Sequence, residues 1–204
     1  MTRWLIACVA LALLALASKA AHADQLSPVE AARLGAGESV SRVQSLDRDG
    51  RHYVGGIAYS IVDAPADDVA LLLTRVEGWS RIVPKTRSAQ RVGQIAGDTL
   101  IEITHGTTLL RAAYTLRVHR DGREMRFWMD RQRPHDIEDA WGFFRAEPWP
   151  DGRSLVTFGV LIDIGDGLVR DLFEGRVLRA ALTVPERVQG LVLERLGAGA
   201  RASR

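Results

Sequence analysis

Residues 57–69 read IAYSIVDAPADDV, a stretch that combines the pattern of a strand with that of a helix start. Its first half is rich in β-branched and aromatic residues, which is typical of a strand. In its second half Asp63 and Ala64 precede Pro65, and two acidic residues follow in the next turn, which is typical of the start of a helix. The stretch therefore predicts a strand over 52–62 that leads directly into a helix.

Outward from this stretch, the sequence predicts a second short helix over 79–83, ended by Pro84. Beyond Pro84 the hydrophobic period becomes two, and turn residues separate short runs in a pattern that favours an antiparallel meander. The predicted strands are 88–95, 99–105, 109–119, 124–131, 140–147 and 154–164. A long helix is expected from near Asp166, and Pro185 should kink or break it.

This order of elements resembles the START-like superfamily, also known as the polyketide cyclase, birch-pollen-allergen or SRPBCC superfamily, which includes coenzyme-Q-binding proteins. The resemblance covers roughly residues 52–196 and is carried by residues 57–69, by WSRIVP at 79–84 and by SLVTF at 154–158. It implies an α+β helix-grip fold, in which a curved antiparallel sheet of about seven strands surrounds a long C-terminal helix and two short helices follow the first strand. It also implies a cavity between sheet and helix that binds an apolar molecule.

The N-terminus has the parts of a cleavable signal peptide. Arg3 precedes an apolar or small run over 4–17, and Ala21 and Ala23 place small residues at the −3 and −1 positions. The run is shorter than the about 20 residues that a bilayer span needs. We expect cleavage between Ala23 and Asp24 and export to the periplasm or the cell exterior; the alternative is an uncleaved anchor.

The expected organisation follows from these boundaries. It comprises a signal peptide at 1–23, an N-terminal helix and extension at 24–50, a START-like domain at 51–196 and a disordered tail at 197–204.

Charge and cysteine content narrow the function classes. The chain has 27 Lys and Arg and 25 Asp and Glu, and two of the basic residues but none of the acids fall in the first 23 positions. The expected mature protein therefore has no formal net charge, which argues against nucleic-acid binding. The only cysteine, Cys8, also lies in the leader, so the mature chain has no disulfide and no thiol nucleophile.

Alternation on the predicted strands indicates which side chains line the cavity. His105 ends a strand whose inward face carries Ile103, and Tyr114 would offer a hydroxyl from the next strand, so both could orient a ligand's polar group. The alternatives are a strand-end histidine satisfied by backbone or water and a locally bonded core tyrosine. The cavity candidates are Trp79, Ile103, His105, Tyr114, Phe127, Met129, Trp141, Phe143, Phe158 and Leu172. Whether Trp128 and Phe144 face inward or outward stays open.

Several signatures of enzymes are absent from the sequence. It has no Gly-x-Ser-x-Gly elbow, no His-Glu-x-x-His, no phosphate-binding glycine loop and no dinucleotide fingerprint. The HDIED loop at 135–139 is interpreted as a solvated acidic loop, and DRDG at 47–50 as a turn, because neither has the ligand spacing of a metal site. We expect no metal and no cofactor, and no catalytic residue is identified.

The favoured function is an exported binding protein that encloses a small hydrophobic or amphipathic ligand, such as a lipid, a quinone or a polyketide-like molecule. The long helix and segment 79–84 could gate entry, and transient contact with a membrane would suit this role. One alternative is a cyclase-like or hydratase-like enzyme that uses His105, Tyr114 or an acid of the 135–139 loop as general acid–base. Another is a structural or interaction domain with a filled cavity. Ligand identity and oligomeric state stay open.

Overall fold

The computed structural model of the protein describes residues 25–106, 111–165, 175 and 178–202. The N-terminal part holds helix α2 (Pro28–Gly35) and strands β1 (Val40–Arg48) and β2 (Arg51–Val62). Helix α3 (Ala66–Leu73), the 3₁₀ turn η1 (Val76–Gly78) and helix α4 (Trp79–Ile82) follow. The remaining elements are β3 (Thr86–Ile95), β4 (Asp98–Gly106), β5 (Arg111–Asp121), β6 (Glu124–Met129), β7 (Asp139–Trp149), η2 (Pro150–Gly152), β8 (Arg153–Asp163) and α6 (Val184–Ala202).

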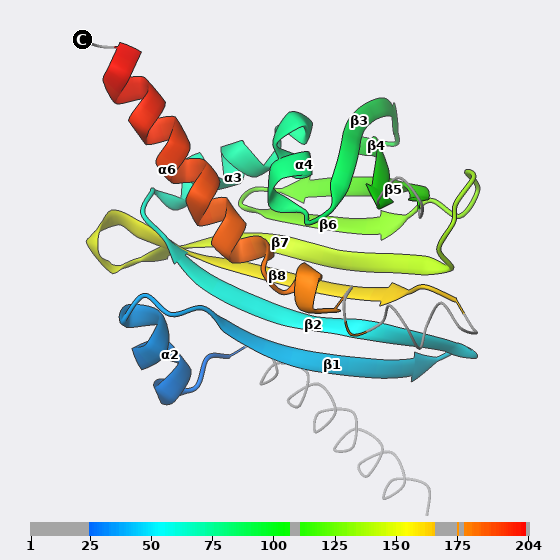
Figure 1. Ribbon diagram of the computed structural model, residues 1–204, viewed down its shortest axis with the longest axis horizontal. Coiled ribbons are helices and arrows are strands. Elements are labelled where there is room, and N and C mark those ends of the chain that lie inside the picture. Colours follow the sequence, from blue (N-terminus) through cyan, green and yellow to red (C-terminus); the bar gives the residue numbers. More distant parts are fainter. Residues whose placement is uncertain (1–24, 107–110, 166–174, 176–177, 203–204) are drawn as a thin grey trace, which may run out of the picture.

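The strands form one antiparallel sheet of eight strands in the order β1-β2-β8-β7-β6-β5-β4-β3. The sheet is curved, and α3, α4 and α6 lie on its concave side (Figure 1). The α+β helix-grip class is therefore confirmed, but the expected number of strands was one too low. The difference is β1, which pairs with β2 from Val40 opposite Tyr59 to Arg48 opposite Arg51 and so belongs to the sheet.

The predicted passage from a strand into two short helices is confirmed. Strand β2 ends at Val62, α3 follows with Pro65 as its N-cap residue, and α4 ends two residues before Pro84. Proline fixes its own backbone and limits the residue before it, which suits both boundaries.

The expected break at Pro185 is confirmed, whereas the C-terminal end differs from the expectation. Residues 178–181 are helical, a turn follows at 182–183, and α6 starts at Val184, so Pro185 lies in the first turn of a new helix, where a missing N–H breaks no helical hydrogen bond. The helix continues to Ala202, through the segment expected to be a disordered tail, because alanine and arginine favour helix. The expected start near Asp166 lies outside the described residues. No helix in the described part of the chain is long and apolar enough to span a bilayer.

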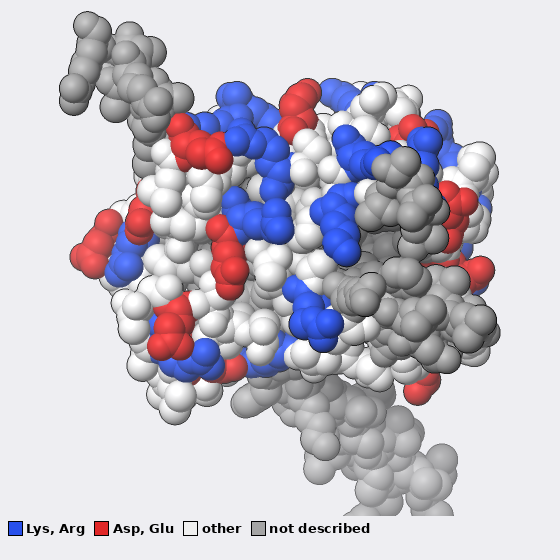
Figure 2. All heavy atoms as spheres, in the orientation of Figure 1, with Lys and Arg blue, Asp and Glu red and all other residues white. Residues whose placement is uncertain are grey.

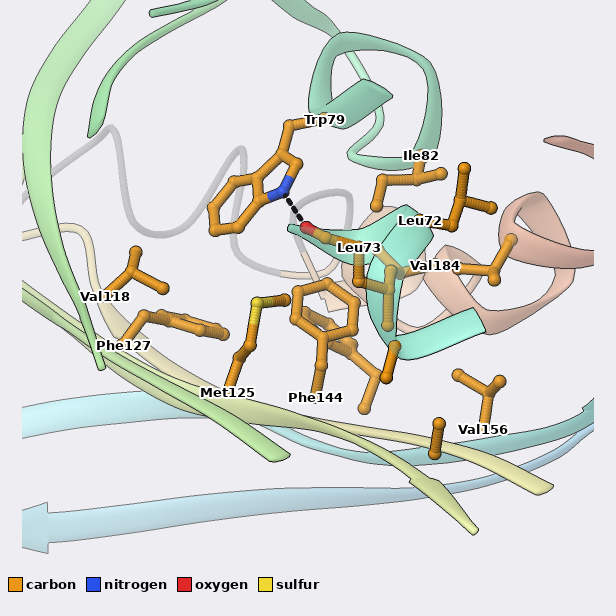
Figure 3. Packing of buried hydrophobic residues seen from close by; sticks show 14 of the residues in the cluster. Leu72, Leu73, Trp79, Ile82, Val118, Met125, Phe127, Phe144, Val156 and Val184 are labelled. Carbon is orange, nitrogen blue, oxygen red and sulfur yellow. Dashed lines mark hydrogen bonds between the residues drawn. The ribbon is translucent and has the colours of Figure 1, made fainter. Parts of the chain in front are cut away.

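The main core lies between the concave face and the helices (Figure 3). Phe144 is at its centre, with ring centroids 4.6 Å from Phe158, 6.0 Å from Phe127 and 6.1 Å from Trp79. The Trp79 indole N–H donates to the Leu73 carbonyl at 2.8 Å, which fixes α4 against α3. A smaller cluster on the convex face joins Leu34 of α2 to Val40, Tyr59 and Leu155.

Strand β7 has the opposite facing to the one predicted. Phe144 is buried in the concave core, whereas Trp141 is exposed and Phe143 half-buried on the convex face. The inward positions beside Phe144 carry small residues because neighbouring rings need the space. A Cβ on Gly142 would lie 2.2 Å from the backbone oxygen of Gly159 and 2.7 Å from Cζ of Phe127, so position 142 has no room for a side chain.

Candidate functional site

A buried polar pair lies on the concave face, among apolar side chains. Strand β4 supplies His105 and strand β5 supplies Tyr114, in a register that places Ile103 opposite Tyr114 and Ala112 opposite His105. Nε2 of His105 lies 2.7 Å from Oη of Tyr114, and the two rings stack with centroids 5.5 Å apart. The pair is thus held by strand pairing, a hydrogen bond and ring contact together.

The other side of the imidazole is also engaged. Nδ1 of His105 lies 3.2 Å from Oγ1 of Thr86, and the imidazole also hydrogen-bonds to the backbone of Pro84. A proline offers only its carbonyl oxygen, so the imidazole must donate to Pro84. Because Thr86 follows Pro84 closely, we assign the proton to Nδ1, which leaves Nε2 to accept from the Tyr114 hydroxyl.

Burial keeps both members of the pair neutral. It lowers the pKa of His105 and outweighs the opposite effect of the Pro84 hydrogen bond. Burial also raises the pKa of Tyr114, so its hydroxyl stays protonated. The Tyr114 hydroxyl donates its hydrogen bond to His105, and the lone pairs of Oη can still accept a hydrogen bond from a ligand.

The surface beside the pair is apolar. Ile103, Leu116 and Met129 are buried in the same core cluster, and Ile137 and Ile162 pack against it while half-buried. Leu116 pairs with Ile101 on β4 and with Met129 on β6, so these side chains form a continuous row next to Tyr114. The arrangement places one neutral polar pair at the edge of a buried apolar cluster.

The other candidates separate into three sets. Trp79, Phe127 and Phe158 belong to the aromatic cluster around Phe144; Figure 3 shows Trp79, Phe127 and Phe144 within this core. Trp141 and Phe143 lie on the convex face and cannot line a concave cavity, which corrects their assignment. Leu172 lies outside the described residues.

One contact of the pair was not predicted. Thr86 was missed because the strand was expected to begin at residue 88, whereas β3 begins at Thr86. Pro84 was the available signal in the sequence. A strand that begins soon after this helix-ending proline places Thr86 opposite His105, at the end of β4.

The acidic loop before β7 has a structural role. Asp136 pairs with Ala113 of β5 twice: its carboxylate accepts from the Ala113 N–H at 2.8 Å, and its own N–H donates to the Ala113 carbonyl at 2.9 Å. Within the described residues no group of three or more His, Cys, Asp and Glu side chains could hold a metal ion.

Comparison with known proteins supports the architecture. No family model matches the sequence, and no curated protein is significantly similar to it. Among solved structures, the Zhui aromatase/cyclase from Streptomyces sp. R1128 has a TM-score of 0.59 at 18% identity, covering 76% of this chain and 96% of that one.

Two further solved structures are similar to this chain in fold. A START superfamily protein from Mycobacterium smegmatis has a TM-score of 0.53 at 11% identity and covers 78% of this chain and 99% of that one. A STAR-related lipid transfer protein from Xanthomonas axonopodis has a TM-score of 0.52 at 13% identity and covers 74% and 97%. Similarity at these identities shows the fold alone.

Proposed function

We propose that this chain, which has the helix-grip fold of START-like proteins, is a binding protein for a small amphipathic molecule. The ligand's apolar body would lie on the concave face against Ile103, Leu116 and Met129. Its polar end would reach Tyr114. The observation that carries the proposal is the 2.7 Å hydrogen bond between His105 and Tyr114 within this apolar surface.

The state of the pair suggests what kind of polar group it receives. A neutral imidazole that accepts from Tyr114 leaves the phenol oxygen as an acceptor, so a ligand hydroxyl is the best match. A charged head group is disfavoured, because neither member of the pair carries a charge to offset the cost of burying one. Affinity would come from apolar burial, at roughly 25 cal/mol per Å² before the costs of binding.

The location of this activity is part of the proposal. The N-terminal sequence supports export, and carrying an apolar molecule through an aqueous compartment requires a binding protein of this kind. Basic and acidic side chains are interspersed on the face that carries the helices (Figure 2), where exposed Arg81 on α4 pairs with Glu194 on α6. Brief contact of this face with a membrane, where the ligand could be collected or released, is part of the proposal.

A second candidate function is catalysis on the bound molecule. A neutral histidine hydrogen-bonded to a tyrosine is an arrangement that can move a proton in a cyclisation or dehydration. The similarity in fold to an aromatase/cyclase is compatible with this reading. It requires turnover, which binding alone does not.

Native mass spectrometry of the gently purified full chain tests the binding function. We expect a co-purifying mass that organic extraction releases, and saturable binding of a fluorescent fatty alcohol or sterol. Repeated isolation of an empty protein that excludes fluorescent fatty alcohols, sterols and quinones would overturn the proposal.

Adjacent alanines provide a matched control. Ala112 and Ala113 are both half-buried and lie on opposite faces of β5. Ala112→Trp should fill the space beside His105 and abolish probe binding, whereas Ala113→Trp adds the same bulk to the convex face and should leave it. Equal binding by the two variants would place the ligand elsewhere.

A further inference from the structure

A second candidate site lies on the opposite, convex face of the sheet. It is a groove of about 560 Å³ between the β1–β2 turn, the start of β2, the middle of β5, the end of β6 and the start of β7. This volume is within the range of about 300–1,000 Å³ that small-molecule sites occupy. The proposed apolar ligand does not use this groove, because the sheet separates it from the His105–Tyr114 pair.

Two tryptophans form the apolar part of the groove. Trp128 of β6 and Trp141 of β7 are directly opposite each other across the strand pair. Their exposed fractions are 36% and 39%, so broad indole surface is open to solvent on neighbouring strands. The guanidinium of Arg117 lies 5.7 Å from the Trp128 ring centroid, which helps to hold that ring in place. Two exposed tryptophans side by side form an apolar patch of the kind that marks binding surfaces.

The polar part of the groove is balanced in charge. Its lining contains three arginines and three aspartates. Asp139 accepts from Arg131 and, at 2.7 Å, from the hydroxyl of Tyr53, and Arg117 pairs with Asp98 at 3.1 Å. No surplus charge therefore selects an anion or a cation, which favours a neutral ligand.

We propose that this groove binds a neutral saccharide chain. The C–H faces of a sugar ring are apolar and flat enough to pack on the exposed indoles of Trp128 and Trp141. Its hydroxyls both donate and accept, and so match the carboxylates, guanidinium groups and the amide of Gln132 that line the same groove. A purely hydrophobic ligand would make no hydrogen bond to Gln132 or to the charged side chains of the groove, and an ion would find no net opposite charge.

Isothermal titration calorimetry with soluble neutral hexasaccharides tests the proposal, using cellohexaose, maltohexaose and chitohexaose and the full chain. At least one should bind. Trp128→Ala and Trp141→Ala should each weaken that binding at least about tenfold, since exposed anchor residues contribute at this level. Trp128→Phe should retain part of the affinity, because it keeps an aromatic face.

A variant outside the groove serves as the control for saccharide binding. Phe143→Leu changes a convex-face aromatic on the same strand, outside the groove, and should bind as the wild type does. Failure of all three hexasaccharides, or binding that survives both alanine variants, would overturn the proposal. So would self-association in sedimentation experiments that Trp128→Ala abolishes, because a second copy of the chain would then cover the groove.

Discussion

Oη of Tyr114 and Nε2 of His105 lie 2.7 Å apart across the β4–β5 strand pair, on the concave face of the sheet. Oη of Tyr53 lies at the same distance from Oδ2 of Asp139, but on the convex face. Two of the protein's three tyrosines thus make hydrogen bonds of equal length to another side chain, and only Tyr114 lies beside the proposed ligand.

The first prediction compares Tyr114 with Tyr53, whose hydrogen bonds have the same length. Tyr114→Phe and Tyr53→Phe each remove one buried hydroxyl, and each should lower the free energy of unfolding by about 1–3 kcal/mol. Only Tyr114→Phe should weaken binding of a fluorescent fatty alcohol, because only that hydroxyl faces the ligand. Urea unfolding and a fluorescence titration measure the two effects. A comparable loss of binding in both variants would mean that the affinity follows stability and not the contact.

The second prediction concerns pH. Burial lowers the pKa of His105 from 6.5, so the unfolded state binds more protons than the folded state below that value. The stability contributed by the neutral imidazole is complete above about pH 6.5 and is lost as the pH falls toward the lowered pKa. Urea unfolding between pH 8 and pH 5 should show this loss, and His105→Gln should flatten the profile.

Replacing another imidazole controls for this effect. His135 is exposed in the loop before β7, and His135→Gln should keep the wild-type dependence on pH. An unchanged profile in His105→Gln would show that the buried pair does not cause the pH dependence.

The third prediction tests the facing of β7. Phe144 is 1% exposed and contacts three other aromatic rings, so Phe144→Ala should cost about 3–5 kcal/mol of unfolding free energy. Phe143, the preceding residue, is half-buried on the convex face, and Phe143→Ala should cost about 1 kcal/mol. Chemical unfolding of both variants measures the difference. Equal losses would contradict the facing described here.

The sequence predicted the elements better than the facing of their side chains. Strands β4, β5 and β6 alternate clearly, and Ile103, Tyr114, Phe127 and Met129 were placed on the concave face correctly. Alternation was informative there because apolar residues alternate with mostly polar ones along these strands.

Strand β7 shows why the same reasoning fails elsewhere. Its concave positions hold Ala140, Gly142 and Ala146, while Trp141 lies on the convex face, so hydrophobicity alone does not identify the buried side. The deciding contact is with the backbone oxygen of Gly159 on β8 and the ring of Phe127, which occupy the space that a side chain at position 142 would need. That contact depends on the neighbouring strand and cannot be read from β7 itself. Thr86 was missed for the same reason, because its role depends on its pairing with His105 on the neighbouring strand.

The fourth prediction concerns acid tolerance. Burial alone would raise the pKa of Asp139, but hydrogen bonds from Arg131 and Tyr53 outweigh it and hold the pKa below 3.8. The stability that the carboxylate contributes is therefore present above about pH 3.8 and is lost as the pH falls through the lowered pKa. Asp139→Asn should be destabilised by about 1–3 kcal/mol at neutral pH and by less below pH 3.8. Asp151→Asn, at an exposed carboxylate, serves as the control, and equal loss in both variants would exclude the buried network as the cause.

The fifth prediction concerns the N-terminus. When the full chain is produced in a Gram-negative host, the periplasmic fraction should contain a form that begins at Asp24, as intact-mass measurement would show. Signal peptidase accepts only small side chains at the −3 and −1 positions, so Ala21→Arg and Ala23→Arg should each leave the precursor uncut. His22→Gln changes the position between them and should be processed normally. A wild-type precursor that stays in the membrane would instead indicate an anchor, and a full-length protein in the cytoplasm would contradict export altogether, leaving the binding function to be sought inside the cell.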